Sequence, residues 1–139
     1  MKLTNFAMLL GAAGVLAACS SSSKIVEPAN MNDQKVYFAF DSSAITEDAR
    51  NNLLGQSLYM KNNPKTKIQL AGNCDERGTA EYNLALGARR ASAAKSVMVK
   101  DGVESSRIST ISYGKERPTK LGSGEDAWKW NRNAATSVK

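Results

Sequence analysis

The pattern of apolar and polar positions predicts strands that alternate with helices from residue 36 onward. Short apolar runs bounded by turn residues predict strands over residues 36–40, 67–71, 107–113 and 134–138, the last of them weak in β-propensity. Apolar stripes at 3.6-residue spacing and capping signals predict helices over residues 46–62, 79–100 and 125–132. We therefore expect an α+β fold, a βαβαβ(α)β sandwich in which a small mixed sheet packs against two main helices.

The helix expected over residues 79–100 carries an arginine inside its apolar stripe. The apolar members of that stripe are Leu86, Gly87, Ala91, Ala94, Val97 and Met98. Arg90 falls within the same stripe, whereas Arg89 is turned toward solvent. A guanidinium keeps its proton, so beside an apolar core it needs an anion.

The polar loop before this helix, residues 72–78, contains the nearest upstream candidate for that anion, Asp75. An aspartate and an arginine presented together at a strand end suit a zwitterionic ligand. The carboxylate of Asp75 would take an ammonium group and the guanidinium fork of Arg90 a carboxylate. The alternative is an internal Asp75–Arg90 salt bridge that holds the loop down, and spacing alone does not separate the two interpretations.

Composition argues against catalysis and against nucleic acid as a partner. The chain of 139 residues has a net charge of +6, but its basic residues are scattered and form no recognisable nucleic-acid-binding motif. Histidine is absent, which removes the commonest general base and metal ligand. We therefore expect no enzyme activity, no metal site and no cofactor.

The first 18 residues are expected to be a signal peptide. Lys2 gives a positive start, and the apolar run over residues 6–16 is too short for a membrane span, which takes ~20 residues. The run ends in Leu16-Ala17-Ala18-Cys19, which resembles the lipobox of bacterial lipoproteins. Cys19 would then carry lipid, and Ser20 behind it favours the outer membrane. The alternative is an ordinary secretory leader that leaves Cys19 as a spare thiol.

Residues 19–34 are predicted to be the lipidated cysteine followed by a serine-rich flexible tether, and residues 35–139 the folded domain. Cys74 is then the only thiol of that domain, so no intramolecular disulfide can form. It is expected to fill a small apolar site beside the loop. The alternative is a reactive thiol next to Arg77.

Long runs of identities at fixed spacing resemble one known family. The segment Gly-Asn-Cys-Asp-Glu-Arg-Gly-Thr-Ala-Glu-Tyr-Asn-Leu-Ala-Leu-Gly-Ala-Arg-Arg-Ala, residues 72–91, resembles the signature of the outer-membrane-protein-A-like peptidoglycan-binding domain, and most closely that of its lipoproteins. Phe40-Asp41 and Ser112-Tyr113-Gly114-Lys115-Glu116-x-Pro118 match as well, so the resemblance covers residues 36–138. Two positions depart: Asn73 stands where the family has histidine, and Asn133 replaces the second of two arginines.

This resemblance implies non-covalent binding of Gram-negative peptidoglycan through its meso-diaminopimelate side chain. Asp75 would take the ammonium of that residue and Arg90 its carboxylate, while Asn83 and Arg132 would add hydrogen bonds. Asp41 is expected either to shape the site or to act as a turn-forming residue. Three neighbouring charged residues are expected to shape the loop or face solvent, namely Glu76, Arg77 and Glu81. Tyr82 is expected either to cover the pocket or to pack in the core.

A lipid anchor at one end and a wall-binding domain at the other imply a tether between the outer membrane and the cell wall. As a family lipoprotein, the chain is expected to work with the Tol envelope-constriction system and to contact TolB and other Tol proteins. A wall-binding lipoprotein outside that system is the alternative. Two further hypotheses are a peptidoglycan-cleaving enzyme, which would rely on carboxylates, and a basic lipoprotein held to anionic polymers by charge alone.

Overall fold

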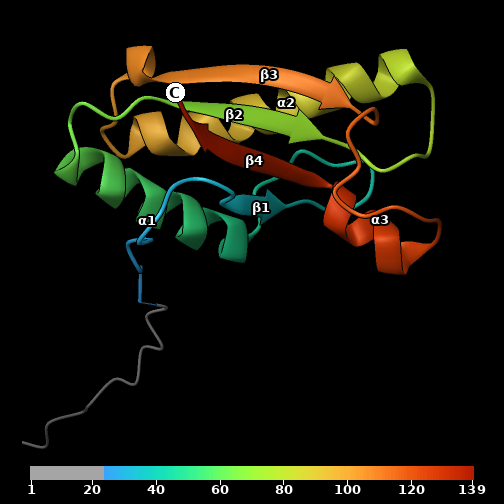
Figure 1. Cartoon of the computed structure of the whole chain (residues 1–139), viewed down its shortest axis with the longest axis horizontal. Coiled ribbons are helices and arrows are strands. Elements are labelled where there is room, and N and C mark those ends of the chain that lie inside the picture. Colours follow the sequence, from blue (N-terminus) through green and yellow to red (C-terminus); the bar gives the residue numbers. More distant parts are fainter. Residues whose placement is uncertain (1–23) are drawn as a thin grey trace, which may run out of the picture.

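A mixed four-stranded sheet with two long helices on one face forms the framework of the computed structural model, which describes residues 24–139 (Figure 1). The elements in chain order are β1 (Lys35–Tyr37), α1 (Glu47–Asn62), β2 (Ile68–Asn73), α2 (Ala80–Lys100), the 3-10 turn η1 (Ser105–Arg107), β3 (Ile108–Gly114), α3 (Glu125–Asn131) and β4 (Asn133–Val138). This order confirms the predicted α+β class. The expected signal peptide and Cys19 lie outside the described residues.

The C-terminal strand lies inside the sheet, whose order is β1-β4-β2-β3. β4 pairs antiparallel with both β1 and β2, while β2 and β3 are parallel neighbours. Its two ladders and the burial of Ala134 and Thr136 stabilise β4 despite its poor β-propensity. Tertiary pairing here outweighs local preference.

Both long helices begin after a threonine cap, at Thr46 as predicted and at Thr79, near which the second helix was expected to begin. The Thr46 hydroxyl accepts the Ala49 N–H at 3.1 Å, and the Thr79 hydroxyl accepts the Tyr82 N–H at 3.1 Å. α2 crosses over from β2 to the parallel strand β3 and packs against both. Its buried residues include the whole predicted stripe, with Arg90 among them. No helix within residues 24–139 is long and apolar enough to cross a membrane.

The folded domain begins earlier than residue 35, in the segment that was expected to be part of a tether. Met31 is 1% exposed and belongs to the hydrophobic core. The Asp33 N–H donates to the Thr136 carbonyl at 3.1 Å, so this segment also continues the sheet. Gly55 makes room for it, because a Cβ there would lie 2.1 Å from the Val26 carbonyl oxygen.

The first strand is shorter than the predicted 36–40, because the chain leaves the sheet after Tyr37. The Phe38 N–H still donates to the Arg132 carbonyl at 2.9 Å, but Phe40 is 58% exposed. Asp41 has a positive φ of 53°, which turns the chain. This turn carries residues 39–42 across the end of β2, beside the loop that follows that strand.

Candidate functional site

A cavity of about 370 Å³ opens at the junction between β2 and α2. Its lining comprises Phe40, Asp41, Cys74, Asp75, Arg77, Gly78, Tyr82, Asn83, Leu86 and Arg90. Four of the five predicted ligand-binding residues are therefore brought to one place. Arg132, the fifth, is not in this lining, but its Nη1 lies 3.7 Å from the Asp75 carboxylate.

Close packing of two glycines brings the loop and the helix together. A Cβ on Gly72 in β2 would lie 1.6 Å from the carbonyl oxygen of Gly87 in α2, so only glycine permits this approach. Gly87 is the position three residues before Arg90, on the same face of the helix. The glycine pair thus places the guanidinium of Arg90 directly beneath the loop.

Asp75 is a buried carboxylate that receives a fork of hydrogen bonds from its neighbour Arg77. The Arg77 Nη2 donates to Oδ2 at 2.8 Å, while the Arg77 side-chain Nε and backbone N–H both donate to Oδ1, at 3.1 and 3.0 Å. Burial opposes ionisation of Asp75, but these hydrogen bonds outweigh it and hold its pKa below the ordinary value. The carboxylate is therefore a fixed negative charge at neutral pH.

Arg90 is only 1% exposed and is held by backbone carbonyls from three separate parts of the chain. Its acceptors are the carbonyl oxygens of Ala39 at 3.0 Å, Ser42 at 2.9 Å and Asn73 at 2.9 Å. Burial lowers the pKa of Arg90, and nearby Cys74 and Asp75 oppose that shift. A guanidinium has five N–H groups, three of which donate to these carbonyls, and Cys74 is a further hydrogen-bonding neighbour.

The predicted alternative, an internal salt bridge between Asp75 and Arg90, is wrong. The ion pairs found within residues 24–139 join Asp75 to Arg77 and to Arg132 and do not join it to Arg90. A carboxylate and a guanidinium therefore line the same cavity while each is fixed by other partners. A ligand with both charges can contact the two groups without breaking a bond between them.

Asp41 and Tyr82 meet at the rim of the cavity, where the Tyr82 hydroxyl donates to the Asp41 carboxylate. Tyr82 is 46% exposed, so it covers the cavity and is not part of the core. Asn83 is buried below it, and its Nδ2 donates to the Arg77 carbonyl at 2.7 Å. Asn83 therefore fixes the loop that carries Asp75.

Aromatic rings hold Arg77 on both sides, which the sequence did not predict. The Arg77 guanidinium carbon lies 3.8 Å from the centroid of Phe40 and 4.0 Å from that of Trp128. Trp128 Nε1 in turn donates to the Glu76 carboxylate at 2.9 Å. These residues are far apart in sequence, so no local pattern links them, and Arg77 acts as the loop-shaping residue that was expected.

Arg132 lies next to Asp75, outside the lining of the cavity. Its Nε donates to the Phe38 carbonyl at 2.9 Å, and its two terminal nitrogens donate to Glu125 at 3.1 and 2.6 Å. The hydrogen bonds from Arg132 lower the pKa of Glu125. With these partners Arg132 braces α3 against the chain leaving β1 and lends positive charge to the wall behind Asp75.

Cys74 is a buried, unpaired thiol whose Sγ donates to the Asn83 carbonyl at 3.2 Å. Burial raises the pKa of this thiol, which keeps it protonated and unreactive. The structure thus favours the small apolar role over a reactive thiol beside Arg77.

The two positions that depart from the family pattern contact each other. Asn73 Nδ2 donates to Asn133 Oδ1 at 2.9 Å in the buried interior. Asn133 Nδ2 also donates to the Trp130 carbonyl at 2.8 Å and to the Thr119 hydroxyl at 3.1 Å. The two substitutions therefore form one hydrogen-bonded unit between the ends of β2 and β4.

Comparison with known proteins identifies the family of this chain. A family model described as "OmpA family" matches residues 37–132. The chain is 44% identical to the peptidoglycan-associated lipoprotein of Mesorhizobium japonicum, over 99% of this chain and 80% of that protein. It is 40% identical to the protein of the same name from Pasteurella multocida, over 96% of each.

Solved structures give the same result. The crystal structure of the peptidoglycan-associated lipoprotein from Burkholderia pseudomallei is 40% identical, with a TM-score of 0.73 over 76% of this chain and 89% of that one. The C-terminal domain of Helicobacter pylori MotB, at 21% identity and a TM-score of 0.71 over 76% of this chain and 84% of that one, shares the fold. The chain belongs to the OmpA family, and within it to the peptidoglycan-associated lipoproteins.

Proposed function

We propose that this protein binds peptidoglycan without cleaving it, through the meso-diaminopimelate residue of the wall peptide. The observation that carries the proposal is the shared cavity of Asp75 and Arg90, two opposite charges that are not paired with each other. Diaminopimelate ends in an ammonium and a carboxylate, so it presents the complementary pair of charges. Proteins of this family are non-enzymatic.

Each charged group of the ligand has a named partner in the proposed complex. The ammonium approaches the Asp75 carboxylate, where it shares or replaces the hydrogen bonds from Arg77. The carboxylate approaches the guanidinium of Arg90, whose orientation is fixed by its three carbonyl acceptors. Tyr82 and Asp41 close the rim over the bound side chain.

At the level of the cell, we infer that the protein ties the outer membrane to the wall. Lipid on Cys19 would hold one end in the outer membrane, and the cavity would hold the other end on peptidoglycan. Membership among the peptidoglycan-associated lipoproteins supports a place in the Tol system, with TolB as the expected protein partner.

A sedimentation assay with purified sacculi tests the proposal. A chain that starts at residue 20 keeps every core residue described here, the first of which is Met31. It should sediment with sacculi, free diaminopimelate should displace it, and no muropeptides should be released. Asp75→Ala should abolish sedimentation, while the matched control Asp126→Ala, at an exposed aspartate of α3, should bind normally. Normal sedimentation of Asp75→Ala would overturn the site assignment.

A further inference from the structure

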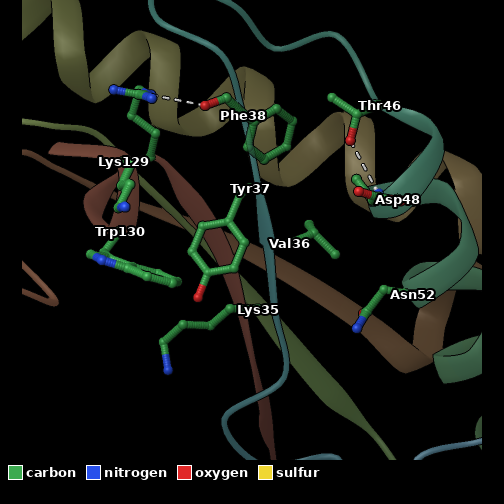
Figure 2. A pocket seen from close by; sticks show the side chains of 11 residues that line it. Lys35, Val36, Tyr37, Phe38, Thr46, Asp48, Asn52, Lys129 and Trp130 are labelled. Atoms are coloured by element: carbon green, nitrogen blue, oxygen red, sulfur yellow. Dashed lines mark hydrogen bonds between the residues drawn. The ribbon is translucent and has the colours of Figure 1, made fainter. Parts of the chain in front are cut away.

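A second and larger hollow, of about 490 Å³, lies along β1, between the start of α1 and the end of α3 (Figure 2). We call it the edge groove and define it by Lys35, Tyr37, Asp48, Asn52, Lys129 and Trp130. β1 is the outermost strand of the sheet on this side. The edge groove is within the size range of small-molecule binding sites, about 300–1,000 Å³.

An aromatic pair forms one wall of the edge groove. Tyr37 and Trp130 have ring centroids 5.5 Å apart and an interplanar angle of 80°. Tyr37 is 37% exposed and Trp130 42% exposed, which is high for rings of this size. Such rings offer an apolar face together with polar tips, a surface that suits ligands that are themselves part apolar and part polar.

Charged side chains and backbone amide groups surround the aromatic pair. In Figure 2, Lys129 lies above Trp130 and Lys35 below Tyr37, while Asp48 lies on the other side of the strand. The Lys129 Nζ is 5.3 Å from the centroid of the Trp130 ring. The backbone of β1 adds amide groups, since β4 is the one strand of residues 24–139 that pairs with β1. The even-numbered positions Gln34 and Phe38 bond toward β4, so the N–H and C=O of Lys35 and Tyr37 point to the open side.

Arg132 and Phe38 place the edge groove next to the Asp75–Arg90 cavity. Both residues line the groove, and Phe40, two residues after Phe38, lines the cavity. Arg132 Nη1 also lies 3.7 Å from the Asp75 carboxylate. The two hollows are therefore neighbours, and Arg132 contacts both.

We propose that the edge groove binds the N-acetylated sugars of the same peptidoglycan strand whose peptide occupies the Asp75–Arg90 cavity. This inference rests on the proposed function. A pyranose ring would stack on the face of Trp130, with the nearly perpendicular Tyr37 ring beside it, and its acetamido group would bond to the open backbone of β1. Lys35 and Lys129 can donate hydrogen bonds to the hydroxyl and acetamido oxygens of the sugars. An added peptide strand fits less well, because β1 has only 3 residues and offers a very short ladder.

Calorimetry with two soluble ligands tests the inference. One ligand is the tripeptide L-alanyl-γ-D-glutamyl-meso-diaminopimelate, and the other carries the same tripeptide on the N-acetylglucosaminyl–N-acetylmuramyl disaccharide. We expect the chain from residue 20 to bind the sugar-bearing ligand about three- to tenfold more tightly, the range that aromatic stacking gives. Trp130→Ala should remove that difference and leave affinity for the bare tripeptide unchanged. Trp130→Phe should keep part of it, and Leu84→Ala, an exposed apolar residue of α2, should keep all of it.

The outcomes separate this inference from the proposed function. Equal affinity for the two ligands, or an equal loss for both in Trp130→Ala, would overturn the sugar site and leave the diaminopimelate site standing. Binding of only the sugar-bearing ligand, lost in Trp130→Ala, would support the sugar site and overturn the diaminopimelate site. Binding of neither ligand by the unmodified chain would overturn both. Thermal melting of each variant verifies that it is folded.

Discussion

The two hollows of this protein differ in how their polar groups are held. In the Asp75–Arg90 cavity, both charged side chains are buried, and each is fixed by three hydrogen bonds. In the edge groove, the aromatic rings are more than one-third exposed. The exposed aromatic side chains that line the larger hollow are therefore held by fewer contacts. Charged groups held in fixed positions can select a ligand that carries the complementary pair of charges. Exposed aromatic rings can contact any of the similar sugar units of a repeating polymer.

Arg90→Ala should have the largest effect on stability, because Arg90 supports the fold as well as the cavity. Its loss removes a buried donor from three carbonyls, of which that of Ala39 keeps a second donor, the Ser42 N–H, and we expect the free energy of unfolding to fall by about 3 kcal/mol or more. Urea unfolding measures this loss. Arg89→Ala, one residue away on the exposed face, is the matched control and should change stability by less than about 0.5 kcal/mol. Equal effects of the two changes would show that the carbonyl contacts contribute nothing.

Asp75→Asn should cost binding more than stability. The amide keeps the shape but not the charge, and loss of one charge-assisted contact predicts about 10- to 100-fold weaker binding of the tripeptide. Calorimetry gives the affinity, with Asp126→Asn as the control. Trp130→Ala should show the opposite selectivity, with normal tripeptide binding. An unchanged tripeptide affinity in Asp75→Asn would contradict the assigned role of this carboxylate.

The pH dependence of stability should show the contribution of the buried Asp75 carboxylate. The folded-state pKa of Asp75 lies below the ordinary value of 3.8. Its contribution is therefore complete above that value and is lost as pH falls through the lower, folded-state pKa. The difference in unfolding free energy between the unmodified chain and Asp75→Asn should be constant from pH 7 to about 4 and shrink at lower pH. A difference that already shrinks between pH 7 and 5 would contradict the lowered pKa.

The smallest expected effect concerns the Asn73–Asn133 pair behind the cavity. A double-mutant cycle with alanine at each position should give a coupling of about 1 kcal/mol, typical of one buried hydrogen bond. The coupling should appear in unfolding experiments, and tripeptide binding should change little. Strict additivity would show that the two departures from the family pattern are independent.

Local patterns predicted what α2 contributes to the site. The 3.6-residue stripe placed Arg90 on the buried face, and Thr79 began the helix as a cap. The acceptors of Arg90 were not predictable, because Ala39, Ser42 and Asn73 reach it only through the tertiary fold. The alternative of an internal Asp75–Arg90 salt bridge was wrong, because Asp75 pairs with Arg77 and with Arg132, which is distant in the sequence.

Other differences between the predicted and the observed structure also come from contacts between residues that are distant in the sequence. Serine-rich composition predicted a tether through residue 34, yet one apolar side chain, Met31, finds a place in the core and draws its neighbours onto the sheet. The pairing of Arg77 with Trp128 joins residues with no common local pattern. β4 formed in spite of its composition because it had two partner strands. Periodicity predicts which face of a helix is buried. Contacts between residues distant in the sequence determine where the terminal segments pack and which partners the charged side chains have.

The three carbonyl contacts of Arg90 have a mechanical consequence for a protein proposed to join two layers of the envelope. Tension between the N-terminal segment and a ligand in the cavity would enter where Val26 and Glu27 contact α1, and would run along β1 to Ala39 and Ser42. There it would pass into the guanidinium that holds the ligand. The helix α1 would share this load at its contacts with the N-terminal segment.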